Sequence, residues 1–158
     1  MTDPTDSRKA EAAAWFRLLR DRIVAAFEGL EDRHAEGKPG RFEVTPTNRA
    51  ESGGGGIMSV MRGGGVFEKV GVNVSTVHGR FAPGFAGSIN GASEADPGFT
   101  ATGISLVAHM ANPQVPAVHM NTRFLTTSKA WFGGGGDLNP MVENPEDTRA
   151  FHAAFKQA

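Results

Sequence analysis

The chain has 158 residues, of which 39% are hydrophobic and 21% charged, so its composition is that of a globular protein and not of a disordered one. Sixteen basic and seventeen acidic side chains give a formal net charge of -1, so no long-range field favours nucleic acid or an anionic membrane over other partners. The chain has no cysteine, which excludes disulfides, thiolate catalysis and metal sites built on cysteine.

The length predicts a single domain that covers residues 1–158. The first residues lead into no uninterrupted apolar run, and no stretch approaches the roughly 20 apolar residues that a bilayer-spanning helix needs. We therefore expect neither a secretory signal nor a membrane span. The lack of cysteine is compatible with a reducing compartment, and we expect a cytoplasmic protein.

A long amphipathic helix is predicted at the start of the chain. Asp3 followed by Pro4 is typical of a helix start, because Asp accepts hydrogen bonds from free amides and Pro suits the first helical position. The helix should end by Gly37. Its apolar residues recur at steps of three and four: Ala12, Phe16, Leu19, Ile23, Phe27 and Leu30.

From Arg41 the pattern changes to that of strands. Phe42 and Val44 alternate with polar residues, and Pro46 should end this strand. Glycine runs at 53–56 and 63–65 bracket the next strand. Two later strands are joined by an Asn-Pro turn and should form a hairpin. The predicted strands are 41–45, 57–61, 66–78, 101–109 and 115–125.

The remaining segments are a long loop, a third glycine run and a second helix. Residues 79–100 are rich in Gly, Pro, Ser and Asn and should form the loop. Glycines occupy 133–136, and a helical pattern starts at Pro145 and is still running at Ala158. Together the elements predict an α+β fold, a largely antiparallel sheet flanked by helices.

The glycine runs do not match the motifs of nucleotide-binding loops. A P-loop requires Gly-Lys followed by Ser or Thr, and no run is followed by Gly-Lys. The dinucleotide fingerprint requires a third glycine at relative position six, where the three runs have Ser59, Glu68 and Asn139. The runs instead suggest close approach of bare backbone to a bulky ligand or to a neighbouring strand.

A stripe of polar side chains is predicted on one face of the hairpin. Residues two apart in a strand share a face, and a turn near 112–113 brings Ser105 opposite His119 or Asn121. A guanidinium, an amide and two imidazoles on one face can bind a carboxylate. The simpler alternative is a solvated outer face, although such faces favour Lys, Glu and Thr. The stripe consists of Ser105, His109, His119, Asn121 and Arg123.

Two further interpretations concern a metal site and a carboxylate. His109, His119 and His152 could supply three nitrogens to a metal ion, although no spacing of these residues requires it. Asp137 follows the glycine run 133–136. On a turn it could cap a helix or form an Asx-turn, and alternatively it could project into a pocket that the glycines keep narrow.

The sequence resembles the oxygen-dependent coproporphyrinogen III oxidases. The matching segments follow one order along the chain and start with Arg49 and the glycine run after it. They continue with 65–75, 77–79, Gly103-Ile104-Ser105-Leu106-Val107 with His109, Asn112-Pro113, Val115-Pro116, His119 with Asn121 and Arg123, and Trp131-Phe132-Gly133-Gly134-Gly135 with Asp137-Leu138 and Pro140.

The resemblance implies an oxidative decarboxylation. Two propionates of coproporphyrinogen III become vinyl groups, with two molecules of oxygen consumed and protoporphyrinogen IX, carbon dioxide and hydrogen peroxide formed. Ser105, Asn121 and Arg123 would bind the substrate, His119 would be the proton donor and Asp137 would face the pyrrole nitrogens. Oxygen would be the co-substrate, with no flavin, nicotinamide or haem. The resemblance also implies a homodimer for the full-length family.

The same resemblance assigns His109, His119 and His152 to a divalent metal. Met110, Asn139 and Thr47 depart from the family pattern at positions beside the site.

Only the amino-terminal half of the family is matched, so the chain is expected to be truncated. The family's fourth metal-associated histidine, its later arginine-bearing segment and its dimer-forming strands have no counterpart here. Two alternatives to the oxidase therefore stay open. One is a non-catalytic tetrapyrrole-binding or structural module, and the other is a different metal-dependent enzyme that uses the three histidines.

Overall fold

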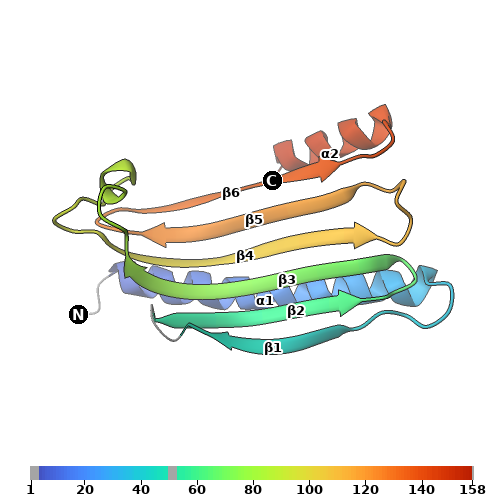
Figure 1. Ribbon diagram of the computed structural model, residues 1–158, viewed down its shortest axis with the longest axis horizontal. Helices are drawn as coiled ribbons and strands as arrows, with labels where there is room; N and C mark the ends of the chain where they lie inside the picture. Colours follow the sequence, from blue (N-terminus) through green and yellow to red (C-terminus); the bar gives the residue numbers. More distant parts are fainter. Residues whose placement is uncertain (1–3, 50–52, 158) are drawn as a thin grey trace.

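The computed structural model describes residues 4–49 and 53–157 (Figure 1). Within these ranges six strands form one sheet in the order β1-β2-β3-β4-β5-β6, and every neighbouring pair is antiparallel. The predicted α+β fold with an antiparallel sheet is therefore confirmed. In chain order the elements are α1 (Pro4–His34), β1 (Phe42–Asn48), β2 (Gly54–Arg62), β3 (Phe67–Arg80), the 3₁₀ helix η1 (Ala86–Ser88), β4 (Gly98–Met110), β5 (Ala117–Thr126), β6 (Ala130–Asn139) and α2 (Pro145–Gln157).

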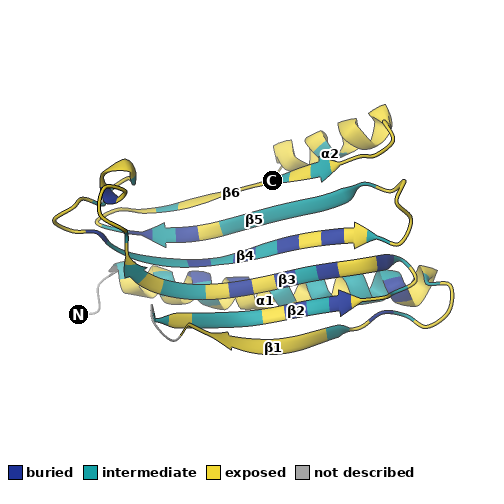
Figure 2. Cartoon of the chain, viewed as in Figure 1, coloured by how far each residue is buried: buried dark blue, intermediate teal, exposed yellow. Residues whose placement is uncertain are grey.

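Helix α1 covers one face of the sheet, lying behind β2 and β3 in Figure 1. Its predicted apolar stripe is confirmed, because Phe16 is 2% exposed and the later stripe residues pack against the same core. Truncation of such a buried phenylalanine to alanine costs about 3–5 kcal/mol of stability. Asp3, the predicted helix cap, lies outside the described residues. Figure 2 shows buried positions in α1 and in every strand from β2 to β5.

The strands differ from the prediction at one proline and at several glycine-rich ends. β1 does not end at Pro46 but runs to Asn48, with Pro46 opposite Ile57. β1 is an edge strand, and one side of an edge strand has no partner, so a residue without an N–H is tolerated there. The glycines at 54–56 do not precede β2 but form its first residues. The 79–100 loop is shorter than predicted, because β3 and β4 extend into both of its ends.

The third glycine run belongs to a strand that the sequence pattern did not predict. Gly133–Gly136 lie in the middle of β6, where each residue pairs with a residue of β5. Asp137 therefore belongs to a strand, which excludes the first of its two interpretations, a helix cap or an Asx-turn. A run of glycines can continue a strand when the neighbouring strand supplies the ladder hydrogen bonds, although it contributes no side-chain packing.

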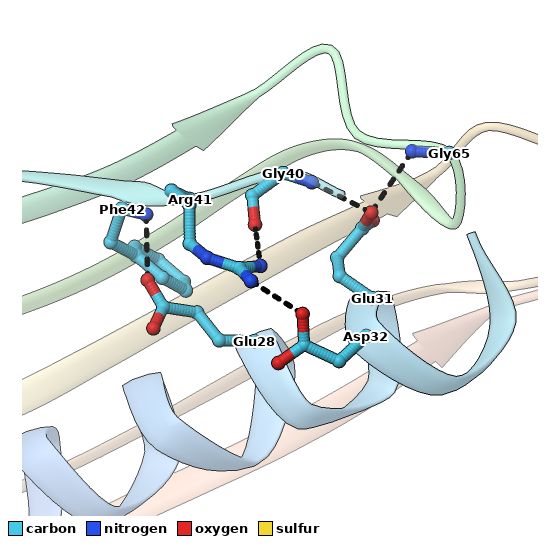
Figure 3. Close-up of polar contacts among 7 residues, drawn as sticks. All are labelled: Glu28, Glu31, Asp32, Gly40, Arg41, Phe42 and Gly65. Carbon is cyan, nitrogen blue, oxygen red and sulfur yellow. Dashed lines mark hydrogen bonds and ion pairs between the residues drawn. The ribbon is translucent and has the colours of Figure 1, made fainter. Parts of the chain in front are cut away.

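A buried carboxylate ties the end of α1 to the sheet (Figure 3). The side chain of Glu31 is 0% exposed and accepts four backbone hydrogen bonds. Its Oε2 accepts from the amides of Gly40 at 2.9 Å and Gly65 at 3.0 Å, and its Oε1 accepts from those of Val66 at 3.0 Å and Phe67 at 2.8 Å. Because one side chain satisfies amides of the α1–β1 link and of the β2–β3 turn, it fixes both connections against the helix.

The two faces of the sheet differ in what covers them. The face toward α1 carries Val72, Leu106 and Met120 on successive strands, and these residues belong to the core or pack against it. The next row on the opposite face is Asn73, Ser105 and Asn121. We call this second face the open face. Its residues in β3 to β6 include Asn73, Ser75, Gly103, Ser105, Val107, His119, Asn121, Arg123, Gly133, Gly135 and Asp137.

Helix α2 starts at Pro145 as predicted and packs on the same side of the sheet as α1. Asn144 caps it, since the side-chain oxygen accepts hydrogen bonds from the amides of Glu146 at 3.0 Å and Asp147 at 3.3 Å. A Cβ added to Gly136 would lie 2.4 Å from the Phe155 ring, so only glycine allows this contact between α2 and β6. α2 therefore leaves the open face uncovered.

Candidate active site on the open face of the sheet

The predicted polar stripe is formed by the β4–β5 hairpin. Ser105 lies directly opposite Asn121, one of the two partners predicted for it, and Val107 lies opposite His119. The reverse face holds Ile104 and Ala108, which are 2% and 0% exposed. The alternation of polar and apolar residues therefore places the stripe on the open face, as the sequence predicted.

Strand β6 adds a carboxylate to this stripe. Asp137 is the register partner of His119, and its Oδ2 lies 2.8 Å from His119 Nδ1. The other carboxylate oxygen accepts a hydrogen bond from the Asn139 side chain at 2.6 Å. On the far side of the imidazole, Asn121 Nδ2 lies 3.4 Å from His119 Nε2. The four side chains thus form a chain of polar contacts across β5 and β6.

The order of these contacts indicates which nitrogen of His119 carries the proton. In the neutral ring, a hydrogen bond to a carboxylate requires Nδ1 to donate, so Nε2 is left as the acceptor that faces the Asn121 amide. The hydrogen bond from His119, followed by that from Asn139, lowers the pKa of Asp137 below its ordinary value. Asp137 is therefore ionised at neutral pH and fixes the orientation of the ring.

A hollow of about 520 Å³ lies over β5 and β6 on the open face. Gly133 and Gly135 form its floor, and a Cβ added to either glycine would meet nothing within 4 Å. The bare backbone therefore leaves space that side chains would fill. We call it the glycine hollow; it is lined by His119, Asn121, Arg123, Leu125, Trp131, Gly133–Gly136 and Asp137.

A second hollow of about 350 Å³ lies next to the first, over β3 and β4. Both are lined by Arg123 and Leu125, so they adjoin along β5. Besides Arg123, the second hollow contains the uncharged polar side chains of Asn73, Ser75 and Ser105 on the open face, and we call it the serine hollow. The two hollows together extend across four strands, from β3 to β6.

Arg123 lies between the two hollows and is exposed. Among the described residues, its guanidinium has no ion pair or hydrogen bond, whereas Arg20 and Arg41 each pair with an aspartate. A free guanidinium beside two concave surfaces is suited to a carboxylate, which it can bind through two parallel hydrogen bonds.

The three histidines predicted as metal ligands are not brought together. His109 and His119 lie on the open face, whereas His152 is an exposed residue of α2, which packs on the other side of the sheet. Among residues 4–49 and 53–157, no group of three or more His, Asp or Glu side chains is placed to hold a metal ion. These residues alone do not fit the predicted metal.

Sequence reasoning missed two features of the site. The first is the pairing of Asp137 with His119, which depends on β6 being a strand. The alternation of Asp137, Leu138 and Asn139 after the glycine run was the available signal, because it places Asp137 and Asn139 on one face. The second is the contribution of β3, whose Asn73 and Ser75 line the serine hollow.

Comparison with known proteins identifies the family of the chain. The sequence model of the family described as coproporphyrinogen III oxidase matches residues 11–158. The protein named oxygen-dependent coproporphyrinogen-III oxidase of Rickettsia bellii (strain OSU 85-389) is 54% identical over 149 residues, which are 92% of this chain and 52% of the relative. The protein of the same name from Rickettsia felis (strain ATCC VR-1525 / URRWXCal2) is 54% identical over 153 residues, 95% of this chain and 54% of the relative.

The chain spans about half the length of the curated relatives it matches. The match nevertheless includes the whole of the open face from β3 to β6, with both hollows and the His119–Asp137 pair. The protein belongs to the coproporphyrinogen III oxidase family.

Proposed function

We propose that the open face binds coproporphyrinogen III and takes part in its oxygen-dependent oxidative decarboxylation to protoporphyrinogen IX, a step of haem biosynthesis. The observation that carries the proposal is the unpaired Arg123 guanidinium between two hollows, beside the His119–Asp137 pair. The names of the relatives support the choice of substrate and of oxygen as the co-substrate.

Each conversion removes one carboxylate and one hydrogen from a propionate. The bond to the carboxyl carbon breaks and releases carbon dioxide, while the carbon attached to the pyrrole loses a C–H hydrogen. The two electrons that leave reduce one oxygen molecule, which takes up two protons and becomes hydrogen peroxide. A second propionate repeats the sequence, so two oxygen molecules are consumed for two vinyl groups.

In this proposal Arg123 grips a propionate, and Ser105 and Asn121 donate hydrogen bonds beside it. Asn121 lies directly opposite Ser105, so both side chains face the same part of the bound molecule. A fixed carboxylate would keep the reacting carbons in one position on the sheet, which is the main contribution that binding makes to such a reaction. The glycine hollow would receive the pyrrole ring next to that propionate.

His119 and Asp137 are the proposed proton-transfer pair. Asp137 holds Nδ1 of His119, so Nε2 is the nitrogen that can exchange a proton with the substrate. When His119 carries two protons, the adjacent carboxylate balances the charge. Each oxygen of Asp137 already accepts one hydrogen bond but retains a second acceptor site, which a pyrrole N–H can use.

The experiment that tests the proposal follows product formation under air and without oxygen. The protein is incubated with coproporphyrinogen III after exhaustive removal of small molecules, and protoporphyrinogen IX and carbon dioxide are measured. We expect both products only with oxygen and without added flavin, nicotinamide or haem. Binding without product under air would support the alternative, a non-catalytic tetrapyrrole-binding module. Absence of both binding and product would contradict the proposal.

Two further expectations from the sequence, a homodimer and a cytoplasmic location, stay predictions. Among the described residues, no helix combines the length and the apolar character needed to cross a membrane.

A further inference from the structure

The serine hollow contains two polar residues to which neither the sequence nor the relatives assign a role. Asn73 and Ser75 belong to β3, are exposed and lie on the open face two residues apart. Asn73 pairs with Ser105, and Ser75 pairs with Gly103. Since neighbouring strands are about 4.8 Å apart, these side chains lie one strand away from the Ser105 hydroxyl on the side opposite Asn121.

The orientation of the Asn73 amide is fixed by the backbone of β2. The side-chain oxygen of Asn73 accepts a hydrogen bond from the Ser59 amide at 3.3 Å. The Nδ2 group must therefore point away from β2, and it lies 3.8 Å from the position that a Cβ on Gly71 would occupy on the open face. The Asn73 side chain lines the serine hollow and carries two N–H donors, while its oxygen is engaged with the Ser59 amide.

Gly103 opens the path between Arg123 and Ser75. The three residues form one row across β5, β4 and β3, with the glycine in the middle. A Cβ on Gly103 would lie 2.8 Å from Arg123 Cβ, closer than such contacts allow. The bare backbone at this position lets the base of the Arg123 side chain lie over β4, so a ligand held by its guanidinium can also reach the Ser75 hydroxyl.

We propose that Asn73 and Ser75 are substrate-binding residues that donate hydrogen bonds to the carboxylate gripped by Arg123. Ser75, Asn73 and Arg123 all line the serine hollow with side chains that can donate hydrogen bonds, and no carboxylate of the protein lines it. Such a set of donors without an acidic partner binds an anion. The inference rests on the proposed function, because it takes the carboxylate to be a propionate of coproporphyrinogen III.

The test is calorimetric titration of the protein with coproporphyrinogen III in the absence of oxygen, which prevents turnover. Ser75→Ala removes one donor. Asn73→Asp keeps the oxygen that Ser59 needs and replaces only the N–H donors with a negative charge. The matched controls are Thr45→Ala and Thr45→Asp, because Thr45 lies on the open face in the same row as Asn73 but outside both hollows.

We expect Ser75→Ala to raise Kd about fivefold to tenfold and Asn73→Asp to raise it more than tenfold, with melting temperatures close to that of the unmodified protein. The Thr45 variants should change Kd less than about twofold. In an Arg123→Ala background the Ser75→Ala effect should largely disappear, because residues that bind one group are not additive.

Two results would overturn this inference while leaving the proposed function intact. One is that Arg123→Ala weakens binding, whereas the Asn73 and Ser75 variants bind like the Thr45 controls. The other is a full Ser75→Ala effect in the Arg123→Ala background, which would place Ser75 at another part of the ligand. If the unmodified protein does not bind coproporphyrinogen III, both the inference and the proposed function fail.

Discussion

His119 and Asp137 face each other across neighbouring strands, with Nδ1 and Oδ2 2.8 Å apart. Asp137 therefore orients the imidazole in addition to contributing a negative charge, because its carboxylate binds Nδ1 and leaves Nε2 available to a ligand. The same carboxylate is held by Asn139 at 2.6 Å, so its own position is fixed from a second side.

The first prediction concerns Asp137→Asn. The amide keeps the size of the side chain but loses the charge and can present an N–H to His119, so the imidazole is no longer held in one tautomer. We expect kcat to fall about a hundredfold while Kd for coproporphyrinogen III changes less than about threefold. Since Asp137 is exposed and lies in a strand, the melting temperature should change little.

Asn139→Ala is the matched control for this variant, because it removes the other partner of Asp137 and leaves the His119 contact. Its kcat should fall less than that of Asp137→Asn. A fully active Asp137→Asn protein would exclude the His119–Asp137 pair from the chemistry.

The second prediction concerns the fork geometry of Arg123. Arg123→Ala and Arg123→Lys should both raise Kd for coproporphyrinogen III, by about a hundredfold and tenfold respectively, because a lysine is a point charge that cannot bind a carboxylate through two parallel bonds. Neither change should lower the melting temperature, since the guanidinium has no partner among the described residues. If Arg123→Lys binds coproporphyrinogen III normally, the guanidinium does not bind the carboxylate through two parallel hydrogen bonds.

The third prediction tests the floor of the glycine hollow. A methyl group at Gly135 meets no protein atom within 4 Å but projects into the hollow, so Gly135→Ala should fold normally and bind coproporphyrinogen III at least tenfold more weakly. Gly87→Ala is the control, because Gly87 is equally free of neighbours but lies in η1, outside both hollows. Equal affinities of the two variants would show that the ring does not lie on β6.

The fourth prediction concerns stability and pH at Glu31. Burial disfavours the charged carboxylate, but the four backbone amides outweigh that effect and hold the pKa of Glu31 below its ordinary value. The unfolded state, with a pKa of about 4.3, therefore takes up a proton before the folded state does. The stabilisation is complete above that pH and is lost as the pH falls through the lower folded pKa.

Glu31→Gln should consequently lower the free energy of unfolding at pH 7 by about 2–4 kcal/mol, because the new NH₂ group faces amides that need an acceptor. The loss should shrink as the pH approaches 3. Asp32→Asn is the control; its carboxylate is 52% exposed and its pair with Arg41 contributes about 1 kcal/mol or less. Urea titrations between pH 3 and 7 measure both. A Glu31→Gln loss that does not vary with pH would contradict this account.

The parts of the fold that the sequence predicted are those in which side chains alternate with a regular period. The stripe from Ala12 to Leu30 identified α1, and the polar and apolar alternation of the β4–β5 hairpin identified the open face. Those patterns arise because one side of each element is buried, so they are visible without any knowledge of the neighbouring elements.

Strand β6 and its contribution to the site could not be predicted in the same way. Four glycines in succession have no side chains and therefore no alternation, and their propensity favours a turn. They are extended here because β5 pairs with them along their whole length. The buried Glu31 is a similar case, since its hydrogen-bond donors come from residues 9 to 36 positions away.

The measurement that tests the central claim most directly is a map of the binding surface by amide NMR. The protein is titrated with coproporphyrinogen III without oxygen, and shifts of assigned backbone amides are followed. We expect the largest shifts at Asn121, Arg123, Gly133 and Gly135, which line the glycine hollow, and small shifts along α1. Shifts concentrated instead in the hollow between α1 and β2, around Phe16 and Ile57, would contradict the claim that the open face is the binding site.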